Sequence, residues 1–404
     1  MIIIADDLTG AADCGVKFSE KGISTEIVFH NDETTDSNVA VYSTDSRSMS
    51  VVEAQNAVNA LAENCSSRIF KKIDSTMRGH VGAELEALLD FSNNELVFLC
   101  PALPLQGRTV KDGICFINEL KIAESVLAKD PLNPVNESEI SKILAQETLI
   151  QTSAVKSTCT KSQILKLYNQ GIRIFSFDAE SDEDLSKIVN LAAQLPLKTV
   201  LAGSSGLAAA VAENLVEELE AEETSKVNDL PLLIVSGSVH ETTQRQIQKL
   251  LESGYIPQFP ISELVDISTE VVSVLSKEKS CLLYTCKGDS DKVANGQKLI
   301  QNLANTVQQI SDSTDFQLVI VGGETAREIS RQLGIGGQRQ RHSTTWTTKS
   351  HSRCVPARSW STALCRGTAA AGLDQVELPE IGAKRKCPAQ SWSKRVRPPV
   401  SVRS

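Results

Sequence analysis

Short apolar runs alternate with amphipathic stretches along most of this chain. Apolar side chains recur at helical spacing between the runs, for example over residues 52–63 and 83–90. The runs that are typical of buried strands cover residues 2–5, 25–29, 39–43, 69–73, 96–100, 172–177, 200–203, 233–236 and 318–321. Such an alternation of strands and helices predicts an α/β fold with mainly parallel sheets.

Polar turns follow three of the early strands. The first strand runs into Asp6-Asp-Leu-Thr-Gly10, the strand at 39–43 ends in Thr44-Asp-Ser-Arg47, and the strand at 69–73 ends in Asp74-Ser-Thr-Met-Arg78. In an open α/β sheet, ligands bind at the carboxyl ends of the strands. Each of these turns is therefore a candidate to contribute to a ligand site.

The first turn places two carboxylates just before a helix. Asp6 and Asp7 are candidates to bind a polyhydroxylated substrate, to deprotonate it or to hold Mg²⁺ through water, and Thr9 is a further substrate contact. The alternative is that Asp7 or Thr9 only caps the helix. Phosphatases of the haloacid dehalogenase type also begin in this way, but their two aspartates are separated by one residue. The adjacent pair in this chain does not fit that pattern.

The turn after residues 69–73 combines acidic, hydroxyl and basic groups. Asp74 is a candidate proton acceptor, and Arg78 can grip a carboxylate or a phosphate through its planar set of donors. Ser75 and Arg108 are candidate substrate contacts, although a Pro/Gly loop around Arg108 is also compatible with a plain connection. The alternative for the whole turn is a helix entry capped by Asp74 or Ser75, with Arg78 in solvent.

Three later turns run from an apolar strand through Gly and Ser or Thr into a helix. Glycine lets the backbone approach a ligand, and the helix amino terminus favours negative charge, so these turns indicate phosphate binding. None of them matches the P-loop spacing, and tight strand-to-helix packing is the alternative. The candidate residues are those at 203–206, then Ser236, Gly237 and Ser238, and finally Gly322, Gly323, Glu324 and Thr325.

The length of the chain predicts more than one domain, and its composition and charge argue against a membrane protein or a nucleic-acid binder. The 404 residues exceed the size of one hydrophobic core, and an acidic, polar connector separates residues 1–225 from a second domain at 230–337. We expect a cytoplasmic protein with reduced thiols, because there is no basic leader, no apolar run of about 18 residues and no metal-ligand spacing among the ten cysteines. The net charge of -9 argues against nucleic acid as a partner.

The charge pattern breaks near residue 338. Residues 338–404 contain 13 of the 41 Lys and Arg residues, only three of the 50 Asp and Glu residues, and all three tryptophans. A basic nucleic-acid arm is one explanation. Our hypothesis is an out-of-frame translation from about residues 334–339, which rereading the coding DNA tests. A segment of this kind is predicted to stay exposed and to leave the strand at 318–321 as an open edge.

Four short motifs resemble those of the four-carbon acid sugar kinases. They are the Ala-Asp-Asp-Leu-Thr-Gly-Ala run at residues 5–11, the Lys-x-Asp-Ser-Thr-x-Arg-Gly run at 72–79, Ser-Gly-Ser at 236–238 and Gly-Gly-Glu-Thr at 322–325. The resemblance spans about residues 1–335. The family's Lys-Ser-Gly-Gly-Phe-Gly type turn near the end, which helps to hold ATP, is not found in this sequence.

The resemblance implies two Rossmann-like three-layer domains, an acid-sugar domain and an ATP domain, with the active site in the cleft between them. The implied reaction, in carbohydrate acid catabolism, transfers the γ-phosphoryl group of ATP, with Mg²⁺, to the terminal hydroxyl of threonate, erythronate or 3-oxo-tetronate. Asp7 or Asp74 is the expected general base, and Arg78 and Arg47 are expected to pair with the substrate carboxylate. Ser236, Ser238 and residues 322–325 are expected to hold the nucleotide phosphates.

Two other functions stay open at this point. A sugar-acid-binding protein without turnover fits the altered carboxyl-terminal segment, and an oxidoreductase is disfavoured because no glycine-rich fingerprint precedes an acidic strand end. The identity of the acid and the oligomeric state are also open, with a homodimer as one arrangement to test.

Overall fold

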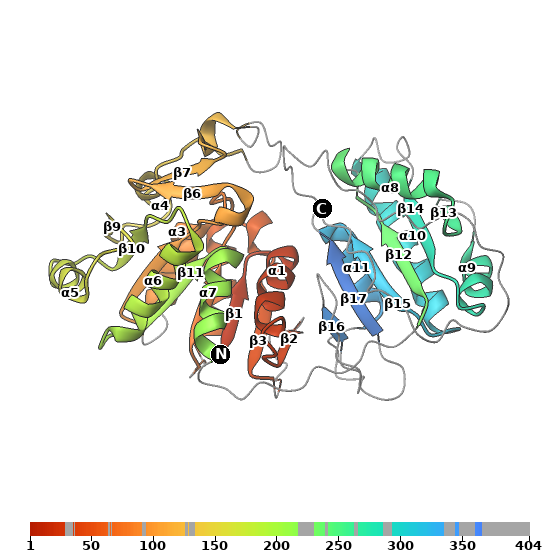
Figure 1. Ribbon diagram of the computed structural model, residues 1–404, viewed down its shortest axis with the longest axis horizontal. Helices are drawn as coiled ribbons and strands as arrows, with labels where there is room; N and C mark the ends of the chain where they lie inside the picture. The colour runs from red at the N-terminus through yellow and green to blue at the C-terminus, as the bar shows by residue number, and fades with distance from the viewer. Residues whose placement is uncertain are drawn as a thin grey trace, which may run out of the picture.

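The computed structural model of this chain contains two α/β units, one from each half of the sequence (Figure 1). Both are built on parallel sheets. The structure describes residues 1–28, 35, 37–63, 65, 67–90, 94–125, 128, 134–216, 230–238, 241–261, 266–285, 293–334, 344–346 and 360–365.

The first unit is built on an eight-stranded parallel sheet with the order β2-β3-β1-β4-β11-β5-β10-β9. Its strands are β1 (Ile2–Ala5), β2 (Thr25–Val28), β3 (Val39–Ser43), β4 (Ile69–Lys72), β5 (Leu96–Cys100), β9 (Thr152–Val155), β10 (Ile174–Phe177) and β11 (Thr199–Gly203). Its helices are α1 (Leu8–Ser19), α2 (Val51–Ala62), α3 (Val81–Asp90), α4 (Ile140–Leu144), α5 (Lys161–Asn169), α6 (Asp182–Gln194) and α7 (Ser205–Val216). Helix α7 packs against α1 and α6, while α2 packs against α3, so helices cover the sheet in two groups.

The strand order places a switch point at β1. The chain passes from β1 to β2 and β3 on one side of β1, and then to β4 on its other side. Crevices at such reversals are the usual ligand sites of open α/β sheets. Since β1, β3 and β4 are adjacent and parallel, the three polar turns that follow them meet at one edge.

The second unit repeats this design on a smaller sheet with the order β13-β14-β12-β15-β17-β16. The chain again reverses at its first strand, β12, which lies between β14 and β15. The elements are β12 (Leu232–Ser236), α8 (Glu241–Ser253), β13 (Gln258–Ile261), α9 (Ser268–Leu275), β14 (Cys281–Thr285), α10 (Val293–Ser311), β15 (Gln317–Val321), α11 (Gly323–Gln332), β16 (Thr344–Trp346) and β17 (Trp360–Cys365).

Both units confirm the predicted α/β class with mainly parallel sheets. The predicted boundary at residues 225–230 falls largely in residues 217–229, which lie outside the described part of the chain. Among the described helices, none is long and apolar enough to cross a membrane.

An antiparallel element in the first unit had only weak signals in the sequence. Strands β6 (Arg108–Lys111), β7 (Ile114–Ile117) and β8 (Leu120–Lys121) form a three-stranded meander, flanked by the short helices η2 (Pro104–Gln106) and η3 (Ile122–Glu124). The strands are so short that their side-chain alternation barely registers in the sequence. The meander places Arg108 beside the polar turns of the large sheet.

One prediction about the carboxyl-terminal segment is wrong. Strand β17 pairs in parallel with β15, and β16 pairs with β17, so the edge of β15 is covered rather than open. The charge of residues 338–404, taken as a whole, hid an uncharged local run at Trp360–Cys365, in which Trp360 and Thr362 are residue types that favour strands. The rest of this segment lies outside the described residues, and its out-of-frame origin stays a hypothesis.

Candidate active site

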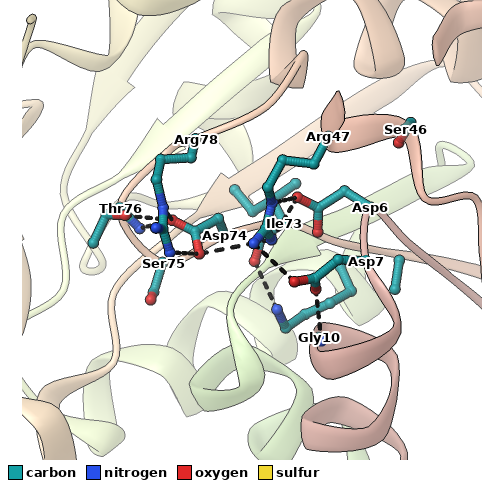
Figure 2. Close-up of polar contacts among 12 residues, drawn as sticks. Asp6, Asp7, Gly10, Ser46, Arg47, Ile73, Asp74, Ser75, Thr76 and Arg78 are labelled. Carbon is teal, nitrogen blue, oxygen red and sulfur yellow. Dashed lines mark hydrogen bonds and ion pairs between the residues drawn. The ribbon is translucent and has the colours of Figure 1, made fainter. Parts of the chain in front are cut away.

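Arg47 lies at the centre of the polar cluster at the switch point (Figure 2). Its Nε donates to Asp6 Oδ2 at 2.8 Å, its Nη1 lies 2.8 Å from Asp7 Oδ2, and its Nη2 lies 3.7 Å from Asp74 Oδ1. Burial lowers the pKa of Arg47, but the three carboxylates outweigh burial and raise this pKa above its ordinary value. One guanidinium thus joins the turns that follow β1, β3 and β4.

Asp7 caps the first helix, one of the two alternatives that the sequence left open, and also pairs with Arg47. Its Oδ1 accepts a hydrogen bond from the backbone N–H of Gly10 at 2.6 Å, which caps α1. Its Oδ2 pairs with Arg47, and about a quarter of the side chain stays exposed. Because each oxygen of Asp7 binds one of these groups, Asp7 fixes the position of the Arg47 guanidinium relative to the first turn of α1.

Asp6 differs from Asp7 in burial and in the state of its second oxygen. It is only 2% exposed, and its Oδ1 has no hydrogen-bond partner among the described residues. Burial raises the pKa of Asp6 to about 6, which the positive charge of Arg47 opposes and the negative charge of Asp7 reinforces. A buried carboxylate oxygen without a partner is a costly feature, and such features mark functional sites.

Asp74 holds Arg78, so the interpretation of Arg78 as a solvated side chain is wrong. Arg78 donates from Nε to Oδ2 and from Nη2 to Oδ1, both at 3.0 Å. Thr76 adds bonds from its backbone N–H and its hydroxyl to Oδ2 of the same carboxylate. Asp74 is fully buried, whereas Arg78 keeps 22% of its side chain exposed. Asp74 therefore orients Arg78 rather than standing open to a substrate.

The meander completes the Arg78 side of the cluster. Arg108, the first residue of β6, donates from Nη1 to the hydroxyl of Ser75. Ser75 is 5% exposed and follows Asp74 directly in the turn after β4. Both candidate substrate contacts thus lie at one place, and Ser75 lies on the side of Asp74 that faces away from Asp7 and Gly10 (Figure 2).

A buried network that the sequence analysis missed supports the Arg47 turn. Lys71 Nζ lies 3.1 Å from Glu84 Oε2, and both side chains are at most 1% exposed. The hydroxyl of Ser46 donates to the same carboxylate and lies 2.7 Å from the hydroxyl of Thr44. The available signal was a pair of lysines, Lys71 and Lys72, at positions where a buried parallel strand is ordinarily apolar.

The glycine-rich turns of the second unit lie side by side at its own switch point. The N–H of Gly237 bonds to the carbonyl oxygen of Val321 at 3.3 Å. A Cβ at Gly237 would clash with Thr325 Oγ1, and Gly322 adopts a φ of +114°, which favours glycine. Ser236 is buried, and Ser238 lies against Gly322. The backbone N–H groups of these turns and of the amino terminus of α11 are therefore placed where they could bind an anion.

The two units touch through their candidate sites. A Cβ at Gly323, the first residue of α11, would lie 2.8 Å from Thr9 Oγ1 in the first turn of α1. Arg327 Nη1 lies 3.6 Å from Asp45 Oδ2, beside Arg47. Asp45 and Arg327 were not predicted, because only the folded arrangement brings them together. The amino termini of α1 and α11 therefore meet at this contact.

The glycine turn at residues 203–206 belongs to the first unit and has a packing role. A Cβ at Gly203 would clash with the carbonyl oxygen of Cys100, and one at Gly206 would lie 2.9 Å from that of Ala102. Ser204 Oγ donates to Ala102 O at 2.5 Å. For this turn the alternative of tight strand-to-helix packing is the one that holds.

Comparisons with known proteins agree with this division of the chain. Residues 1–211 match the family described as "Sugar-binding N-terminal domain", and residues 233–343 match "Nucleotide-binding C-terminal domain". A sugar-binding domain followed by a nucleotide-binding domain, in a chain whose relatives are named D-threonate kinase and 3-oxo-tetronate kinase, places it in the class of sugar-acid kinases. The chain belongs to the four-carbon acid sugar kinase family.

Curated relatives and solved structures show the same relationship. A D-threonate kinase of Salmonella typhimurium is 30% identical over 84% of this chain and 88% of its own length. A 3-oxo-tetronate kinase of Cupriavidus necator is 28% identical over 82% of this chain and 85% of its own length. A crystal structure from Salmonella typhimurium LT2, described as a putative tRNA synthase, superposes with a TM-score of 0.71 at 21% identity over 83% and 88% of the two chains, which shows the fold alone.

Proposed function

We propose that this protein transfers the γ-phosphoryl group of ATP to the terminal hydroxyl of a four-carbon sugar acid. The observation that carries the proposal is the contact between Thr9 and Gly323, where the polar cluster of the sugar-binding domain meets the glycine turn of the nucleotide-binding domain. Phosphoryl transfer needs in-line positioning and charge neutralisation above all. A site between a sugar-binding and a nucleotide-binding domain can align the two substrates, and its cationic side chains and helix amino terminus can neutralise the phosphoryl charge.

The cluster supports one orientation of the acid. Its carboxylate would lie at Ser75, Arg78 and Arg108, the end that carries two guanidinium groups and a hydroxyl. Its terminal hydroxyl would lie toward Asp6 and Asp7, at the end where α1 meets the nucleotide-binding domain. Arg47 is engaged by carboxylates of the protein, so its role in this proposal is to hold them in place.

The general base that this geometry favours is Asp6, rather than Asp7 or Asp74. Both oxygens of Asp74 and of Asp7 already accept bonds or ion pairs, whereas Asp6 Oδ1 has no partner among the described residues. A base is most effective when its pKa lies near the working pH, and the pKa of Asp6 is raised to about 6. Asp7 and Asp74 become positioning residues in this proposal.

The nucleotide phosphates would bind at Ser236, Gly237, Ser238 and the 322–325 turn. The close approach of Gly237 and Gly322 to neighbouring atoms fits a backbone cradle, because a side chain at either position would meet Thr325. Glu324 pairs with Arg327 and is largely exposed. Within the described residues no group of three ligands could hold a metal, so Mg²⁺ would arrive with the phosphates, its usual ligands in kinases.

A coupled ADP-release assay over D-threonate, L-threonate, the erythronates and 3-oxo-tetronate tests the function. Phosphorylation of one acid supports the kinase. The sugar-acid-binding protein without turnover predicts a different result, namely that an acid raises the melting temperature while ATP does not and no ADP forms. Sedimentation of the same preparation tests the expected homodimer.

Arg78→Lys is expected to raise KM for the acid on the order of 10- to 100-fold, with a small change in kcat. Lysine cannot reproduce the two-point contact of a guanidinium, and the site loses substrate binding rather than chemistry. Steady-state kinetics with saturating ATP measure both constants. Arg173→Lys is a matched control, because Arg173 bonds to the carbonyl of Tyr168 far from the cluster. A fall in kcat with unchanged KM would contradict the assigned orientation.

A further inference from the structure

Lys72 is a buried lysine that has no part in the reaction proposed above. It ends β4 and is 1% exposed, and among the described residues the polar partner of its Nζ is the carbonyl oxygen of Ile73 at 2.9 Å. The neighbouring Lys71 is equally buried but pairs with Glu84. A buried ammonium that lacks a carboxylate partner is unfavourable, so its retention calls for a functional explanation.

The ammonium of Lys72 lies beneath the first turn of α1. A Cβ at Gly10 would lie 3.0 Å from Lys72 Nζ and 3.7 Å from Asp6 Oδ1, so both groups approach the same residue. The amino terminus of α1 is capped by Asp7 Oδ1, and the Lys72 ammonium adds positive charge beside it, which favours a further anion there. A Cβ at Gly10 would also lie 2.5 Å from Asp7 Oδ1, so a side chain there would disturb the helix cap as well as crowd the ammonium.

The nucleotide-binding domain reaches this place from the other side. Thr9, adjacent to Gly10, contacts Gly323 at the amino terminus of α11. Two helix amino termini and one ammonium therefore converge near Asp6, whose unpartnered oxygen is 98% buried with its side chain. This convergence suits a group that carries several negative charges, such as the phosphoryl group between donor and acceptor.

We propose that Lys72 binds the phosphoryl group during its transfer, an inference that rests on the kinase function proposed above. The terminal hydroxyl oxygen of the acid forms a bond to the γ-phosphorus, and the bond from that phosphorus to the β,γ-bridging oxygen breaks. The leaving ADP keeps the electron pair of the broken bond. The hydroxyl proton passes to Oδ1 of Asp6, and the Lys72 ammonium neutralises the oxygens of the moving group.

Lys72→Met tests this role in the full-length chain. Methionine is similar in length but uncharged, and we expect kcat to fall by about 100- to 1,000-fold, as for loss of one preorganised donor. KM for the acid should change by less than roughly threefold, because its carboxylate binds at the Arg78 end. Lys72→Arg, which keeps the charge, should recover part of kcat.

Two further measurements, of thermal stability and of anion binding, distinguish a role of Lys72 in phosphoryl transfer from a merely structural role. The melting temperature of Lys72→Met should equal or exceed that of the wild type, since the change removes a buried charge that forms no ion pair within the described part of the chain. Lys71→Met, the matched control, should lower it. Calorimetric titration with inorganic phosphate should show binding to the wild type and at least a tenfold weaker affinity in Lys72→Met.

The inference is overturned if Lys72→Met keeps kcat within about threefold, raises KM for the acid instead, or binds phosphate as the wild type does. Failure of the proposed function looks different. In that case the wild type phosphorylates none of the acids, and the phosphate titration of the two proteins still decides whether Lys72 forms an anion site.

Discussion

Asp6→Asn is expected to lower kcat by about 10²- to 10⁴-fold, the range for loss of a general base. Asparagine keeps the size of the side chain but cannot take the proton of the substrate hydroxyl. The buried Oδ1 of Asp6 has no partner among the described residues, and the side-chain oxygen of asparagine can still accept the bond from Arg47 Nε, although the ion pair with Arg47 is lost. Initial rates at saturating ATP and acid measure the loss, and the melting temperature checks that the variant is folded.

The pH profile gives the same assignment an independent check. The wild-type kcat/KM should rise with pH through an apparent pKa of about 6, because the base works only when it is ionised. The charges that face Asp6 are those of Arg47, Asp7, Lys71 and Lys72. Asp6→Asn should remove this limb. If the limb survives in Asp6→Asn and disappears in Asp7→Asn, the base is Asp7.

Lys71→Met is expected to lower the free energy of unfolding by about 3–5 kcal/mol, the loss measured when one partner of a buried ion pair is removed. Glu84 would be left as a buried carboxylate whose neighbour is the hydroxyl of Ser46. Because that hydroxyl anchors the turn that carries Arg47, activity should fall together with stability. Urea denaturation followed by circular dichroism measures the change.

The double variant Lys71→Met with Glu84→Gln is the control for this interpretation. Glutamine removes the charge but can still accept from Ser46, and replacing both members of a buried pair is often close to neutral. Most of the lost stability should therefore return. A double variant as unstable as Lys71→Met alone would show that packing, and not the unpaired charge, governs this position.

Much of the fold and part of the site follow from local features of the sequence. The apolar runs at Ile2–Ala5, Val39–Ser43 and Leu96–Cys100 are strands with those bounds, because runs of four or five apolar residues between polar turns are long enough for a buried strand and short for a helix. The turn residues Asp6, Arg47 and Asp74 were candidates for the same reason: charged groups at the ends of buried strands must face a ligand, a partner or solvent.

Tertiary structure alone decided how the candidates divide their roles. The strand order brings the ends of β1, β3 and β4 together, so that one guanidinium, Arg47, meets three carboxylates that are up to 68 residues apart in the chain. No local pattern records such pairings, because their energy depends on burial and distance in space rather than on spacing in sequence. The same holds for Lys71 and Lys72, adjacent and identical in type. One is neutralised by Glu84 from α3, and the other lies beside Gly10 in the first turn of α1.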